Sequence, residues 1–204
     1  MAEIKKAAVI GAGVMGAGIA AHITNAGVPC VLLDIVPKDG ANRNAIAEGA
    51  VAKLLKTDPA PFMSKKNASL ITTGNIEDNL DLLKDCDWIV EAVIERLDIK
   101  QALYKKIDAH RKKGSIVSSN TSTIPLKDLT SDMPASLMPD FIITHFFNPP
   151  RYMRLLEIVG SDKTRPEAMD TIQQFGDIKL GKGVVRCKDT SLPSLMSPNC
   201  WIVS

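Results

Sequence analysis

A histidine and a glutamate lie on neighbouring predicted strands, where they could carry out acid–base chemistry together. His145 lies near the end of the apolar stretch 141–146, and Glu157 follows twelve residues later in the apolar stretch 155–159. If these strands pair through the intervening turn, the carboxylate can bond one imidazole nitrogen and leave the other free as a base. Such a base could remove a hydroxyl proton while a hydride leaves the same carbon, which typically contributes about 10²–10⁴-fold in rate. Taken alone, a histidine on an apolar strand is more often a core residue.

A glycine-rich turn supplies the second part of the predicted site. The motif Gly11-Ala12-Gly13-Val14-Met15-Gly16 lies between a predicted strand and a predicted helix, a context typical of dinucleotide binding. Gly11 permits the tight turn, Gly13 admits the pyrophosphate, and Gly16 lets helix and strand pack closely. The pyrophosphate would then bind at the helix N-terminus, beside Val14 and Met15.

Asp34 predicts which cofactor binds there. It ends the second predicted strand, 18 residues after Gly16, where the ribose-binding acid of such a unit belongs. Its carboxylate can accept hydrogen bonds from the ribose hydroxyls, whereas the 2′-phosphate of NADP would meet a like charge. The sequence therefore favours NAD over NADP. The alternative is a simple turn with an incidental surface aspartate.

Further polar residues follow other predicted strands, so they belong at the carboxyl edge of the sheet, where ligands bind. Asn120 and Ser122 follow the strand that ends at Ser119, and Ser122 could donate a hydrogen bond to a substrate oxygen. Alternatively, Ser122 or Thr123 caps a short helix near residue 126.

Glu95 and Lys100 follow the strand predicted over 88–93. We expect Glu95 to face the nicotinamide end of the cofactor and Lys100 to meet a phosphate or a substrate oxygen. The alternative for both is a solvated helix start, with Glu95 in a position that the helix dipole favours. His22 and His110 lie in predicted helices without such neighbours, and we expect them to be structural or exposed.

Alternating strands and helices must position these residues. Hydrophobic periodicity predicts strands over 7–10, 30–33, 69–72, 88–93, 115–118, 141–146, 155–159 and 183–186, and helices over 14–25, 40–56, 75–83, 98–111 and 166–175. This alternation predicts an α/β fold of the Rossmann type, a doubly wound, mainly parallel sheet with helices on both faces.

The composition excludes several classes of protein. The chain has 204 residues, 45% hydrophobic and 24% charged, with a formal net charge of +2, as in ordinary soluble domains. The balanced charge gives no reason to expect a nucleic acid or a membrane as partner. Four scattered cysteines form no CxxC pair and lie near no histidine cluster, so we predict no metal site and a cytoplasmic location. Lys5, Lys6 and the apolar run 7–21 superficially resemble a secretory signal, but its cleavage would discard the glycine motif.

The sequence resembles the L-3-hydroxyacyl-CoA dehydrogenase family from about Ile4 to Thr190. The resemblance rests on the glycine motif with Asp34, on segment 89–95 with Lys100, on segment 119–122, and on segment 145–149 with Glu157. It implies oxidation of the 3-hydroxyl group of an acyl-CoA thioester by NAD, as in fatty-acid β-oxidation. It also implies that His145 and Glu157 form the catalytic pair and that Ser122 contacts the substrate. From their places at the sheet edge, we predict that Glu95, Lys100 and Asn120 bind the cofactor.

The last residues depart from the family pattern. Family members continue after the segment matching 187–190 with Pro-Gly-Phe-Ile, an Asn-Arg pair and a helical domain that carries dimer contacts and closes over the substrate. Residues 191–204 show none of this, and Asn199 does not stand in the context of the family's catalytic asparagine. We therefore expect an NAD-binding domain over 1–190, a non-family tail over 191–204 that arises from a frameshift or an early stop, and impaired turnover.

Three functions remain open at this point. The first is an active 3-hydroxyacyl-CoA dehydrogenase, and the second is a catalytically silent NAD-binding module. The third is a related NAD-dependent dehydrogenase for small hydroxy acids or sugar acids. The expected partner is an acyl-CoA, and whether the chain forms a homo-oligomer or associates with a complementing polypeptide is also open.

Overall fold

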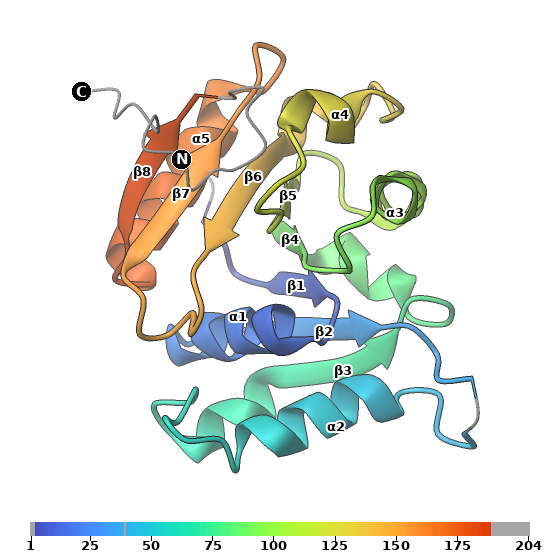
Figure 1. The fold of residues 1–204 in the computed structure, drawn as a ribbon, viewed down its shortest axis with the longest axis vertical. Helices are drawn as coiled ribbons and strands as arrows, with labels where there is room; N and C mark the ends of the chain where they lie inside the picture. Colours follow the sequence, from blue (N-terminus) through green and yellow to red (C-terminus); the bar gives the residue numbers. More distant parts are fainter. Residues whose placement is uncertain (1–2, 39, 189–204) are drawn as a thin grey trace.

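One twisted sheet organises the chain (Figure 1). The computed structural model describes residues 3–38 and 40–188, and within them eight strands form a single sheet in the order β3-β2-β1-β4-β5-β6-β7-β8. The strands from β3 to β6 are parallel to their neighbours, in the order of two mononucleotide-binding halves. β7 runs antiparallel to β6, and β8 is parallel to β7. The predicted Rossmann-type fold is confirmed.

The strands are short and mostly buried on both faces, as parallel strands under two helical layers must be. Their bounds are β1 (Ala7–Ile10), β2 (Cys30–Asp34), β3 (Ile71–Asn75), β4 (Trp88–Glu91), β5 (Ile116–Ser119), β6 (Phe141–Phe146), β7 (Leu155–Val159) and β8 (Gly183–Cys187). The helices are α1 (Val14–Asn25), α2 (Ala45–Leu54), α3 (Leu97–His110), α4 (Leu126–Thr130) and α5 (Pro166–Gln174), with short helical turns η1 (Lys65–Leu70), η2 (Leu80–Asp85), η3 (Met138–Asp140) and η4 (Phe175–Lys179).

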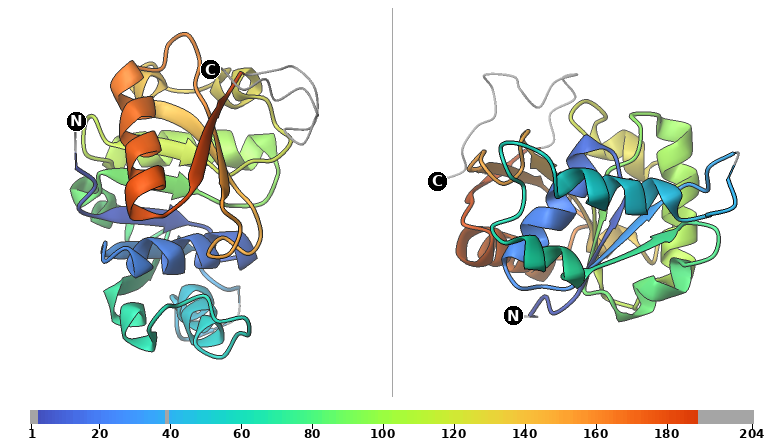
Figure 2. Two further views of the ribbon diagram at one scale, coloured as in Figure 1. Left: turned by 90° about the vertical axis from the view of Figure 1, so that its left-hand side faces the viewer. Right: turned by 90° about the horizontal axis from the view of Figure 1, so that it is seen from below.

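Helices cover both faces of the sheet because alternate residues of each strand point to opposite sides. Ala7 and Val9 of β1 belong to a core cluster with α1, α2 and α5, whereas Ala8 and Ile10 belong to a second cluster with α3 and α4. In Figure 1, α3 and α4 lie on the right-hand side, and α5 lies on the left-hand side next to β7 and β8. Figure 2 shows α5 over the part of the sheet formed by β6, β7 and β8.

The strand predicted over 69–72 lies at Ile71–Asn75, and three other predicted boundaries are wrong where a local side-chain hydrogen bond redirects the backbone. The helix predicted from residue 40 begins at Ala45, since the Asn42 side chain accepts the backbone N–H of Asn44 in a local turn that competes with helix. The helix predicted from Asn75 is a strand end followed by a turn. There the Asn75 side chain is buried and accepts the backbone N–H groups of Glu77 and Asp78.

The third boundary lies at the end of β4. The strand predicted over 88–93 ends at Glu91, whose carboxylate accepts the backbone N–H of Val93 and so turns the chain out of the sheet.

The predicted tail 191–204 lies outside the described residues. Among those described, no helix is long and apolar enough to cross a membrane, and no group of three or more metal-binding side chains comes together.

Candidate active site

The glycine turn joins β1 to α1 and crosses the carboxyl edge of the sheet. Gly11 has φ of +105°, and a Cβ there would collide with the carbonyl of Ala92 at the end of β4. A Cβ on Gly16 would collide with the carbonyl oxygen of Gly11. A Cβ on Gly13 would meet nothing within 4 Å. Gly11 and Gly16 therefore make the turn possible, and Gly13 leaves open space above it.

The N-terminus of α1 is exposed to that open space. Its N-cap residue is Gly13, no side chain caps it, and its first turn holds no acidic residue. The N–H groups at the start of a helix lack intrahelical partners and carry the positive end of the helix dipole, so they favour an anion. Val14 is 66% exposed, and Met15 packs against the core beneath it. The turn has the geometry of a pyrophosphate cradle.

Asp34 lies at the end of β2, beside this turn. Its carboxylate accepts the backbone N–H of Ala12 and, at 2.6 Å, that of Ile35. It borders a cavity of about 470 Å³ whose lining is mainly apolar: Ile76, Ala92, Val93, Ile94, Ile99 and Leu103 among others. A mainly apolar cavity with a carboxylate among its lining residues suits an adenine ring and its ribose, so the residues present fit NAD.

His145 and Glu157 face each other across β6 and β7. They are directly opposed in the antiparallel register, and Nδ1 of His145 lies 3.0 Å from Oε2 of Glu157. Each residue is only 6% exposed. An ionised carboxylate can only accept, so Nδ1–H donates, and Nε2 of His145 has no hydrogen-bond partner among the described residues. The predicted pairing of these strands is confirmed.

Asn120 connects this pair to the neighbouring strand. Its side-chain oxygen accepts the backbone N–H of Phe146 at 2.9 Å, which ties the end of β5 to the end of β6. The carboxyl ends of β1, β2, β4, β5 and β6 thus meet at one edge, where they hold the glycine turn, Asp34 and His145 together.

Comparisons with known proteins agree with this geometry. Residues 6–190 match the family profile described as 3-hydroxyacyl-CoA dehydrogenase, NAD binding domain. The chain belongs to this family.

Relatives with this domain are longer than the chain. A Deinococcus radiodurans protein named for 3-hydroxyacyl-CoA dehydrogenase is 49% identical over 187 residues, which cover 92% of the chain and 54% of the relative. A Rickettsia felis protein named as a fatty acid oxidation complex trifunctional enzyme is 46% identical, and the match covers 92% of the chain and 26% of that protein. Among solved structures, that of 3-hydroxybutyryl-CoA dehydrogenase from Escherichia coli superposes with a TM-score of 0.77 at 25% sequence identity. The match covers 93% of the chain and 39% of the Escherichia coli chain. The chain therefore spans about a quarter to a half of the length of these relatives.

Glu95 of this dehydrogenase-family domain organises the loop that carries Ser122. Its carboxylate accepts the backbone N–H groups of Ser122 at 3.1 Å and Thr123 at 3.2 Å, together with the hydroxyl of Thr121. Partial burial pushes the pKa of Glu95 upward, but the hydrogen bond from Thr121 and the charge of Lys100 outweigh it and hold the pKa below its ordinary value. Ser122 itself is exposed, and the N-cap of α4 is Pro125, without a side-chain cap.

Lys100 lies deeper than expected from the sequence. It is 1% exposed, and its ammonium lies 2.7 Å from Glu91 and 3.2 Å from Glu95. The alternative interpretation, in which Lys100 lies at a solvated helix start, is therefore wrong. Its predicted contact with a phosphate or a substrate oxygen stays a prediction, because two carboxylates hold the ammonium here.

Glu91 is a buried residue of this family domain that sequence reasoning left without a role. It is 0% exposed, and its carboxylate accepts hydrogen bonds from Lys100, Tyr104, Ser119 and the backbone of Val93. Burial, followed by the nearby Glu91 charge, raises the pKa of Tyr104 well above its ordinary value. The signal in the sequence was a lone acid inside the apolar run 88–94.

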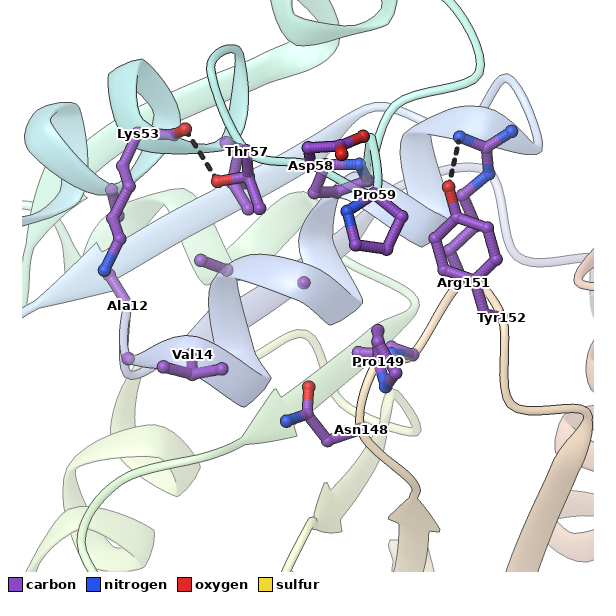
Figure 3. Close-up of a pocket in the computed structure, with 17 residues that line it drawn as sticks. Ala12, Val14, Lys53, Thr57, Asp58, Pro59, Asn148, Pro149, Arg151 and Tyr152 are labelled. Atoms are coloured by element: carbon purple, nitrogen blue, oxygen red, sulfur yellow. Dashed lines mark hydrogen bonds between the residues drawn. The ribbon is translucent and has the colours of Figure 1, made fainter.

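A second cavity, of about 520 Å³, lies beside the glycine turn (Figure 3). α1, the end of α2, the loop at 57–61 and the β6–β7 connection at 148–152 line it, mostly with apolar atoms. Figure 3 shows Lys53 extending from α2 toward the turn at Ala12, with Arg151 and Tyr152 on the opposite side. Asn148 also lines this cavity. Its place two residues after the end of β6, near the carboxyl edge of the sheet, is the feature of the sequence that could have indicated it.

Proposed function

We propose that this domain binds NAD and takes part in the oxidation of 3-hydroxyacyl-CoA to 3-oxoacyl-CoA, with His145 as the general base. The observation that carries the proposal is the hydrogen bond from Nδ1 of His145 to Glu157, 3.0 Å long, which leaves Nε2 as a base at the edge of the sheet where NAD fits.

The chemistry requires one proton and one hydride to leave the substrate. Nε2 of His145 accepts the proton of the 3-hydroxyl group, and the charge of Glu157 stabilises the imidazolium that forms. Bound NAD supplies the acceptor for the hydride from the same carbon. The hydroxyl of Ser122, exposed on the loop that Glu95 holds, is the proposed donor to the substrate oxygen.

Two observations support an acyl-CoA as substrate. The cavity of about 520 Å³ beside the glycine turn has a largely apolar lining with Lys53 at its wall, which suits an apolar chain attached to an anionic carrier. The names of the relatives refer to 3-hydroxyacyl-CoA and to a fatty acid oxidation complex. We therefore place the proposed activity in fatty-acid β-oxidation. Association with other domains or chains and a cytoplasmic location stay predictions.

The test is oxidation of NADH by the purified chain with acetoacetyl-CoA, run beside NADH binding by fluorescence. We expect NADH binding and any turnover to depend on different residues, so that His145→Ala abolishes turnover and retains binding. Absence of NADH binding would overturn the whole proposal.

Two other outcomes correspond to the alternative functions. Binding without turnover would identify a silent NAD-binding module. Equal turnover of free acetoacetate and acetoacetyl-CoA would indicate a dehydrogenase for small hydroxy acids, because the CoA moiety would then contribute nothing to substrate binding or to the rate.

A further inference from the structure

Lys182 carries a buried ammonium group that the proposed chemistry does not use. It directly precedes β8 and is 5% exposed. Burial lowers its pKa to about 8, and no carboxylate among residues 3–38 and 40–188 offsets this. Burying a charge without a counter-ion is destabilising unless hydrogen bonds satisfy it. The identity of its acceptors therefore indicates what the residue does.

Both acceptors belong to the connection between β6 and β7, residues 147–154. The ammonium donates to the carbonyl oxygen of Pro150 and, at 2.7 Å, to that of Met153. The backbone N–H of Gly183 donates to the carbonyl of Arg154 at 2.8 Å, which adds a backbone contact beside it. Lys182 and Gly183 thus bind the connection at three carbonyl groups, those of residues 150, 153 and 154.

The connection has little freedom on its other sides. Pro150 packs against α1, since a Cβ on Gly18 would lie 3.0 Å from Cδ of Pro150. Arg151 donates to the carbonyl of Phe62 at 3.0 Å and to that of Ala60. Lys182 adds contacts from a third element, the start of β8.

The same ammonium reaches the end of β6. Its Nζ lies 5.9 Å from the centre of the Phe146 ring, within cation–π range. Phe146 follows His145 directly, and its N–H is bound by Asn120. One cation therefore contacts both the strand end that carries His145 and the connection that leads to the strand carrying Glu157.

We propose that Lys182 is a positioning residue for the His145–Glu157 pair, which it aligns by holding the β6–β7 connection. The functional part rests on the proposed function above, in which His145 is the base. Lys182 itself touches neither cofactor nor substrate in this assignment.

The test reads the pair directly, without need of turnover. The chain has three histidines, so a spectrum of ¹⁵N-labelled imidazoles is simple, and His145→Gln assigns the relevant signals. Lys182→Met keeps the apolar stem and removes the donors, and it should shift or broaden the Nδ1–H signal of His145. Lys182→Arg retains a cation with several N–H donors and should restore it. Lys179→Met, at an exposed lysine three residues earlier, should leave it unchanged.

Kinetics and binding supply the second readout. If the chain turns over acetoacetyl-CoA, Lys182→Met should lower kcat by about 10- to 100-fold through misalignment, with the Kd for NADH changed by less than about twofold. Absence of turnover in the wild type would count against the proposed function alone, since the His145 signal still tests the positioning.

An unchanged His145 signal in folded Lys182→Met would overturn the inference. If that variant does not fold, Lys182→Leu, which also removes the donors and keeps an apolar side chain, carries the same test. Failure of both to fold would also overturn it, because Lys182 would then be a general folding residue.

Discussion

His145 and Glu157 stand directly opposite each other on antiparallel strands, with Nδ1 and Oε2 3.0 Å apart and both residues nearly buried. The register of β6 and β7 brings the two residues together, although twelve residues separate them in the sequence. A shift of β7 by one residue against β6 would send Glu157 to the other face of the sheet while His145 stayed in place, and the pair would be lost.

Glu157→Gln should therefore impair catalysis without removing the base. The amide can donate as well as accept, so it no longer fixes the imidazole tautomer or stabilises the imidazolium. We expect kcat with acetoacetyl-CoA to fall on the order of 10²–10⁴-fold while NADH binding is retained. Glu167→Gln, at an exposed position in the first turn of α5, is the matched control. Equal kcat for wild type and Glu157→Gln would remove Glu157 from the mechanism.

Asp34→Asn should change cofactor choice. The asparagine can still accept the N–H of Ala12, so the turn should persist, but the charged acceptor for the ribose is lost. We expect the Kd for NADH to rise about tenfold or more, since charge-assisted hydrogen bonds contribute about 1.5–3 kcal/mol. The Kd for NADPH should rise less or fall. Fluorescence titration with both cofactors checks this, with Asp81→Asn as the exposed control. A parallel rise for both cofactors would contradict it.

The order of strands and helices, and the sheet edge at which ligands are expected to bind, could be predicted from the sequence. Glycine spacing and Asp34 predicted the turn whose φ and collisions the structure shows, because such a motif permits few backbone paths. The predicted start of a helix at Asn75 and the predicted end of a strand at 93 were wrong, because a polar side chain accepts a backbone N–H at Asn75 and at Glu91. Those hydrogen bonds depend on burial, which local periodicity does not report.

Contacts between distant elements were the least predictable part of the site. A lysine near the start of a predicted helix is usually exposed, but Lys100 is buried in an ion pair with Glu91. Only the packing of α3 against β4 brings these two residues together. Lys182 lies about thirty residues from Pro150 and Met153 in the sequence, and no motif in either segment predicts that they come into contact.

His22 should make folding stability depend on pH. It is buried in α1, neither ring nitrogen has a hydrogen-bond partner in the described part of the chain, and burial, then the charge of Lys182, lowers its pKa to about 4. In the unfolded chain the His22 imidazole becomes protonated near pH 6.5, whereas in the folded chain it stays neutral down to about pH 4. The free energy of unfolding therefore decreases as pH falls from 6.5 toward 4. The loss of stability attributable to His22 is up to about 3 kcal/mol.

Urea unfolding at several pH values measures this dependence. His22→Leu should flatten the curve between pH 6.5 and 4, while His110→Gln, at a partly exposed histidine, should leave it as in the wild type. Identical curves for His22→Leu and the wild type would assign the acid sensitivity to carboxylates instead.

The Glu91–Lys100 ion pair should show strong coupling. Both side chains are at most 1% exposed, so removal of one leaves the other buried without its full partner. We expect Glu91→Gln or Lys100→Met alone to cost about 3 kcal/mol of unfolding free energy, and the double variant to cost less than their sum. A double-mutant cycle by urea unfolding measures the coupling. The exposed pair Lys105 and Asp132 is the control, for which we expect less than about 1 kcal/mol. Additive losses at Glu91 and Lys100 would show that they do not act as a pair.

Two glycines of one turn should respond to the same substitution in opposite ways. At Gly16, the Cβ of alanine would meet the carbonyl oxygen of Gly11, so Gly16→Ala should destabilise the fold by about 3 kcal/mol. At Gly13, φ is −65° and the space beyond Cα is open, so Gly13→Ala should change stability by less than about 0.5 kcal/mol. That open space is where the pyrophosphate would approach the backbone, so Gly13→Ala should raise the Kd for NADH about tenfold or more, a loss of about 1.4 kcal/mol. Urea unfolding and NADH titration on both variants separate the two roles, and tight NADH binding by Gly13→Ala would exclude the turn as the phosphate site.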